Sequence, residues 1–242
     1  MAGHSHWARI KRQKAAVDKT RAKDFSKLSK AIMIAARAGG GDPDANLSLR
    51  YAIDRARAGN MTNDSIDRAI KKATGELGDK VFEDVVYEGY GPGGVAMMIE
   101  ATTDNRSRTA PDLRALFTKH GGNLATPGAV AFQFERKGLL GVPLDAASED
   151  EVFELAVEAG ADDVQKGEDS YQVATSPQAF DAVKRAFGAK GWTLTTAELA
   201  YVPQNMVQPD PETARKVETL IQGLENLDDV QNVYTNLDAP PE

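Results

Sequence analysis

The sequence predicts an α+β fold: a small N-terminal helical domain followed by two small α+β domains, of which the middle one is discontinuous. Two patterns indicate this fold. In the first 80 residues, apolar side chains recur at three- and four-residue steps, as they do on amphipathic helices. Beyond them, short strand-like stretches alternate with helical patterns and glycine-rich turns. A chain of 242 residues is long enough to bury a substantial core.

Residues 1–80 are predicted to form a basic arm and a domain of three short helices. The arm is assigned to residues 1–20, which lack a clean apolar period. The first helix starts near Ala22, and the glycines at 39–41 end it, because glycine readily adopts the backbone conformation of a helix end.

The second and third helices also have recognisable starts. Asp42 offers an N-cap to the second helix, with Pro43 at its first position. This helix ends at the Gly-Asn pair of 59–60. Either Thr62 or Asn63 caps the third helix.

The middle domain is predicted to begin with residues 81–136. Strands over 82–87 and 95–101 flank a glycine-rich segment, which predicts a hairpin. A helix over 107–119 follows, and another strand is expected over 130–134.

Residues 137–203 are predicted to form a domain whose strands and helices are complete in themselves. Its expected elements alternate between strand and helix along the chain: 139–142, 149–159, 171–175, 177–189 and 192–201.

The last helix, over 211–224, and the last strand, over 230–235, then have no partner unless they pack back on the middle domain. We therefore expect a discontinuous middle domain of 81–136 plus 204–242, with 137–203 inserted in it.

The charge is divided unevenly along the chain. The net charge is −7, but residues 1–80 contain 17 Lys/Arg and 9 Asp/Glu, whereas residues 81–242 contain 12 and 27. The whole N-terminal excess lies in residues 1–40. A basic head on an acidic body predicts a polyanionic partner.

The residue patterns give no indication of catalysis, a cofactor or a metal. The glycines of 89–94 fit G-x-G-x-x-G, but a strand follows them where a dinucleotide site needs a helix, so a hairpin turn is favoured. His4, His6 and His120 have no further ligand at metal-site spacing. With no cysteine, thiolate sites are excluded, and we expect neither an enzyme nor a cofactor. No apolar run is long enough to span a membrane.

The basic arm is the strongest candidate site. Lysine and arginine bind nucleic acids by neutralising phosphates, and Trp7 offers a stacking surface for a base. The alternative is a solvated charged helix face with Trp7 packed against the body. The candidate nucleic-acid-binding residues here are Trp7, Arg9, Lys11, Arg12, Lys14, Lys19, Arg21 and Lys23.

A smaller basic motif covers residues 103–109, where a predicted strand leads into a helix. Arg106 and Arg108 there could join the helix N-terminus in binding an anion. Asp104 or Asn105 acting as a simple helix cap explains part of the motif equally well.

Seven stretches together resemble the YebC/PmpR family. The resemblance extends from residue 2 to at least residue 235. Each stretch alone is weakly specific, but the set is highly specific. These stretches are residues 2–7, 39–46, 69–75, 87–94, 103–109, 134–138 and 202–205.

The resemblance implies three domains, the middle one discontinuous, and a non-enzymatic regulator of gene expression. Family members are described as DNA-binding transcriptional regulators, and some as translation factors at the ribosome, with mitochondrial translational activators among the relatives. We expect a DNA-binding transcriptional regulator. The alternative is a translation factor that binds ribosomal RNA. The family motif begins at residue 2, which favours the cytoplasm, and we expect the acidic domains to recruit protein partners.

Overall fold

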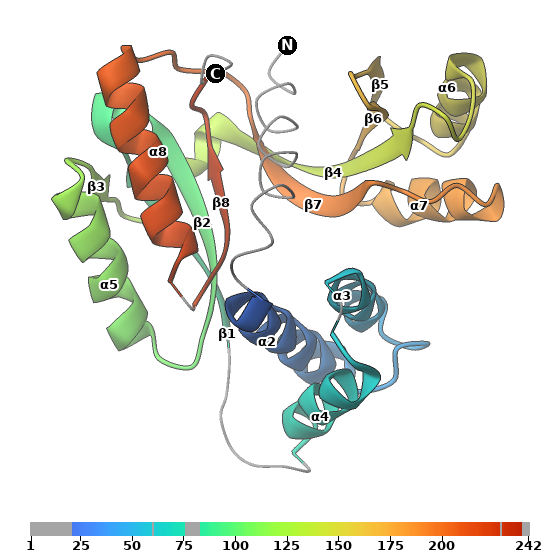
Figure 1. Cartoon of the computed structure of the whole chain (residues 1–242), viewed down its shortest axis with the longest axis horizontal. Coiled ribbons are helices and arrows are strands. Elements are labelled where there is room, and N and C mark those ends of the chain that lie inside the picture. Colours follow the sequence, from blue (N-terminus) through green and yellow to red (C-terminus); the bar gives the residue numbers. More distant parts are fainter. Residues whose placement is uncertain (1–20, 60, 76–82, 228, 239–242) are drawn as a thin grey trace. The chain divides into compact units, whose positions relative to one another are not determined.

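The computed structural model describes residues 21–59, 61–75, 83–227 and 229–238, with side chains from residue 27 onward. It divides into two compact units, Met1–Phe132 with Asn205–Glu242, and Gln133–Gln204. The first unit holds the N-terminal helices and one sheet, and the second holds another sheet (Figure 1). The predicted α+β class is thereby confirmed, and the three-domain boundaries stay predictions.

Helices α2 (Arg21–Gly39), α3 (Leu47–Ala58) and α4 (Asn63–Ala73) form the N-terminal part of the first unit (Figure 1). Thr62 caps α4, since its side chain accepts the N–H of Ser65. Helix α2 packs against both other helices, and the three apolar faces share one core. Its buried members include Ile32, Ala36, Leu49, Ile53, Ile66 and Ala69.

The predicted start of α3 at Asp42 is wrong. The N-cap is Asn46, whose Oδ1 accepts the N–H of Leu49 at 3.1 Å. The Nδ2 of the same buried side chain donates to the carbonyls of Ala35 at 2.7 Å and Gly40 at 2.8 Å. Asn46 thus satisfies the end of α2 and the start of α3 at once, which Asp42, lacking a donor, could not do.

The sheet of the first unit is antiparallel, in the order β3-β1-β2-β8. The predicted hairpin consists of β1 (Glu83–Tyr90) and β2 (Ala96–Thr103), joined by a 3₁₀ turn over Pro92–Gly94. The edges are the short β3 (Asn123–Leu124) and the C-terminal β8 (Val230–Thr235), which pairs with β2.

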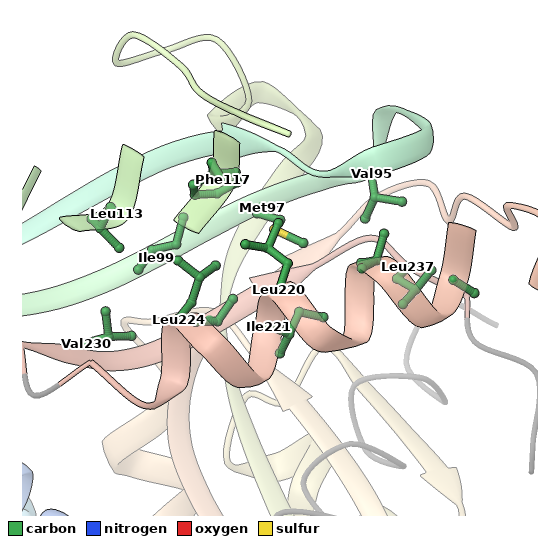
Figure 2. Packing of buried hydrophobic residues seen from close by; sticks show 13 residues of the cluster. Val95, Met97, Ile99, Leu113, Phe117, Leu220, Ile221, Leu224, Val230 and Leu237 are labelled. Carbon is green, nitrogen blue, oxygen red and sulfur yellow. The ribbon is translucent and has the colours of Figure 1, made fainter. Parts of the chain in front are cut away.

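Helices α5 (Arg106–Lys119) and α8 (Pro211–Glu225) cover one face of this sheet. Figure 2 shows their apolar side chains meeting those of β2 and β8. Segments of the chain that are far apart in sequence therefore share one core. Its fully buried members include Val95, Met97, Ile99, Leu113, Phe117, Leu220, Leu224 and Val230.

The strand predicted over 130–134 is wrong for its first residues, because a carboxylate takes their backbone donors. Glu88 accepts the N–H groups of Gly128 and Val130 at 2.6 Å and of Ala131 at 2.9 Å. Residues Ala131–Gln133 then form a 3₁₀ turn. Burial by itself raises the pKa of the Glu88 carboxyl, but the three hydrogen bonds outweigh it and lower the pKa.

Replacing Glu88 with glutamine should lower the free energy of unfolding by about 2 kcal/mol, because the amide has one acceptor oxygen where the carboxylate has two. Three buried or partly buried N–H groups depend on these acceptors. Urea denaturation would measure the loss. The matched control is Glu154→Gln on an exposed position, where we expect a change below about 0.5 kcal/mol. Equal stability of the two variants would contradict this account of the loop.

The second unit contains a four-stranded antiparallel sheet in the order β5-β6-β4-β7, with two helices packed on it. The chain order is strand-helix-strand-strand-helix-strand, one strand more than predicted. The additional strand is the short, polar β5. The elements are β4 (Phe134–Pro143), α6 (Glu149–Glu158), β5 (Asp163–Lys166), β6 (Ser170–Thr175), α7 (Phe180–Ala189) and β7 (Thr196–Pro203).

Candidate nucleic-acid interface

Most of the predicted site lies outside the described residues. Arg21 and Lys23 belong to the first turn of α2, and their side chains are likewise outside the description. The role of these residues therefore stays a prediction from the sequence. The predicted positions before α2 are Trp7, Arg9, Lys11, Arg12, Lys14 and Lys19.

Arg106 is the first residue of α5, and the structure gives it an acidic partner. Its Nε and Nη2 donate to the two carboxylate oxygens of Glu83 at 2.6 and 2.7 Å. The Arg106 side chain is 57% exposed. A guanidinium has five N–H donors, so the two hydrogen bonds to Glu83 leave other donors of Arg106 facing solvent.

Arg108 lies two residues further into α5 and contacts two carboxylates. Its Nη2 is 2.9 Å from Asp104 and 2.9 Å from Asp229. Half of the Arg108 side chain is exposed. Asn105 is the N-cap of α5, so the capping interpretation of the 103–109 motif describes part of it correctly.

Asp229 is the centre of this cluster. Its Oδ1 accepts a hydrogen bond from the Nζ of Lys30 on α2 at 2.8 Å. Its Oδ2, which contacts Arg108, also accepts a hydrogen bond from the hydroxyl of Thr109 at 2.7 Å. Burial alone would raise the pKa of the Asp229 carboxyl, but the hydrogen bonds from Lys30, Arg108 and Thr109 lower it to about 2. The 103–109 motif, which the sequence suggests as an anion site, therefore already contacts an anion of the chain itself, the Asp229 carboxylate.

The sequence reasoning missed a second group of cations, on α3 and α4. Among the described residues, no carboxylate pairs with any of the five, and four of them are exposed. The net charge of the 41–80 segment hid them, because its seven basic residues balance its seven acidic ones. These unpaired cations are Arg55, Arg57, Arg68, Lys71 and the half-buried Lys72.

The described residues include no candidate metal site and no candidate membrane span. Over these residues, no three histidine, cysteine or carboxylate side chains lie together as metal ligands. Among the described helices, none is long and apolar enough to cross a membrane.

Comparison with known proteins supplies the family. A profile described as "TACO1/YebC protein N-terminal domain" matches residues 5–76, and one described as "TACO1/YebC second and third domain" matches residues 82–237. A relative from Dictyoglomus turgidum is 49% identical over 100% of this chain and 98% of its own. One from Rubrobacter xylanophilus is 50% identical over 100% and 97%. Both are named "Probable transcriptional regulatory protein".

A solved structure supports the same relationship. The crystal structure of a conserved hypothetical protein from Aquifex aeolicus is 48% identical, has a TM-score of 0.85 and covers 93% of both chains. Likeness at this level extends over both units and confirms the resemblance seen in the sequence motifs. The two profile matches run from the N-terminal helices to the last strand, and the chain belongs to the TACO1/YebC family.

Proposed function

We propose that this chain is a non-enzymatic, nucleic-acid-binding regulator of gene expression that acts on DNA as a transcriptional regulator in the cytoplasm. The observation that carries the proposal is the basic N-terminal region in a chain whose full-length relatives are named as transcriptional regulatory proteins. The names of the relatives support a role in regulation, and the positive charge of the N-terminal region supports a partner that carries phosphates.

In this proposal the arm and the N-terminal helices bind phosphates. The arm, residues 1–20, supplies five lysines and arginines, and the unpaired cations of α3 and α4 add to this positive charge. Arg106 and Arg108 would have to share their guanidiniums between carboxylates and phosphates, which their free N–H donors permit.

Apart from Arg106 and Arg108, the part of the chain after residue 80 is expected to stay away from the nucleic acid. Residues 81–242 carry 12 basic and 27 acidic residues, so phosphates repel this part as a whole. We propose that it orients the bound protein and recruits protein partners.

The proposal is tested by crosslinking the chain to nucleic acids in living cells and sequencing both the DNA and the RNA recovered. A transcriptional regulator should enrich DNA near promoters. If ribosomal RNA predominates instead, the translation-factor alternative replaces this proposal, because A-form RNA offers the same phosphates to the same cations.

A further inference from the structure

The N-terminal helices border a hollow of about 400 Å³ that is open to solvent. It lies between α3, α4 and the turn that precedes α3. The floor is aliphatic: Ile53 and Ile66 are buried, and Ile70 is half-buried. The volume falls at the small end of the range for ligand sites, about 300–1,000 Å³.

Two unpaired cations line this hollow, one from each helix. Arg57 comes from the end of α3 and Lys71 from the end of α4, and both side chains are exposed. Within the described part of the chain, neither has a carboxylate partner. Asp67 also lines the hollow, one helical turn before Lys71, without forming an ion pair with it. The net charge of the lining is therefore positive.

An aliphatic floor beside two cations suits a segment of a polyanion that has both an anionic part and an apolar part. A phosphate accepts hydrogen bonds from a guanidinium or an ammonium, and a sugar ring packs on isoleucine side chains. A free inorganic phosphate would leave the apolar floor uncovered, whereas one nucleotide unit of a strand would cover it.

We propose that this hollow, defined by Ile53, Arg57, Ile66, Ile70 and Lys71, binds the sugar-phosphate backbone of a nucleic acid. The phosphate contacts Arg57 and Lys71, and the sugar lies over the isoleucines. This inference rests on the proposed function and adds a defined contact outside the arm. Backbone contacts of this kind fix the register of a protein on its nucleic acid and carry no base specificity.

The first experiment compares two double variants of the full chain on a labelled duplex DNA of random sequence. Arg57→Ala with Lys71→Ala removes the two cations of the hollow. Arg215→Ala with Lys190→Ala removes the same two residue types from exposed positions that belong neither to the lining nor to the proposed interface. The hollow variant should bind about fiftyfold more weakly at 0.1 M salt, with a salt slope reduced by about 2. The control should lose less than about threefold.

A second measurement locates the contact directly. The natural chain has no cysteine, so one introduced thiol can carry a photo-crosslinker without side reactions. A label on Asn63→Cys, at the rim of the hollow, should crosslink to the duplex at least fivefold more than a label on Ala58→Cys, an exposed α3 position outside it.

Each contrary result has a distinct meaning. Equal losses in the two double variants, or equal crosslinking at both cysteines, would show a diffuse positive field and overturn the site. If neither double variant loses affinity while neutralising the arm abolishes binding, the proposed function survives and the hollow does not bind DNA. An acidic peptide would then be its candidate occupant. If the unchanged chain binds no nucleic acid, both proposals are wrong.

Discussion

Replacing Arg9, Lys11, Arg12 and Lys14 together with alanine should weaken binding to duplex DNA by about a thousandfold at 0.1 M salt. Each cation that neutralises a phosphate contributes about 0.9 to the slope of log affinity against log salt. Removing four should therefore lower that slope by about 3 to 4. The loss should be nearly the same for every DNA sequence, because phosphates carry no base information. Fluorescence anisotropy between 50 and 300 mM salt would measure both quantities.

The matched control removes an equal charge from the acidic part of the chain. The control replaces four exposed cations that lie on β5, on α8, on α7 and directly after α7, and none of them belongs to the predicted interface. A comparable loss in this control would mean that net charge alone governs binding. An unchanged salt slope in the arm variant would show that the arm does not bind phosphates. The control positions are Lys166, Arg185, Lys190 and Arg215.

A double-stranded RNA measured beside the duplex DNA would show which polymer the arm prefers. A-form RNA hides its base edges in a deep, narrow groove and offers 2′-hydroxyls in a shallow one. An arm that contacts only phosphates should lose affinity for both polymers in parallel. A loss confined to RNA would favour the translation-factor alternative.

The fold was predictable wherever local sequence determines local structure. Helix α4 has a capping threonine, an amphipathic period and a closing glycine within 14 residues, so no distant contact was needed to find it. The strand predicted over 230–235 has the bounds of β8. In both cases the preferences of neighbouring residues agree with the tertiary packing.

Errors arose where a distant side chain decides the outcome. Val130 and Ala131 have strand-forming neighbours, but their backbone donors bind the Glu88 carboxylate, more than 40 residues earlier. Asn46 displaces Asp42 as a cap because its amide also binds the end of the preceding helix. Single-sequence patterns contain no information about such partners.

The same limit applies to the candidate interface. The motif in the sequence pointed to Arg106 and Arg108, but not to their acidic partners. Glu83 accepts hydrogen bonds from Arg106 and Asp229 accepts one from Arg108, so some of the N–H donors are already in use. The sequence reasoning also missed Arg57 and Lys71, since only the structure shows that they line one hollow. A sum of charges cannot distinguish paired from unpaired cations, and that distinction decides which of them a phosphate can reach.

Replacing Asp229 with alanine should lower the free energy of unfolding by about 4 kcal/mol, as expected when one partner of a buried ion pair is removed. The Lys30 side chain is only 12% exposed, so removing the carboxylate would take an ionic partner from a largely desolvated ammonium. The hydroxyls of Thr103 and Thr109 would each also lose one acceptor. Urea denaturation would measure the loss, and Asp112→Ala, an exposed carboxylate on the same unit, should change stability by less than about 0.5 kcal/mol.

The same carboxylate predicts how stability depends on pH. The folded protein lowers the pKa of Asp229 from 3.8 to about 2, so its stabilising contribution is complete above pH 4 and is lost as the pH falls toward 2. The shift corresponds to about 2 kcal/mol. The difference in stability between the unchanged chain and Asp229→Ala should therefore narrow by about that amount from pH 5 to pH 2. A constant difference would mean that the carboxyl titrates normally in the folded state and that Lys30 and Arg108 do not hold its charge.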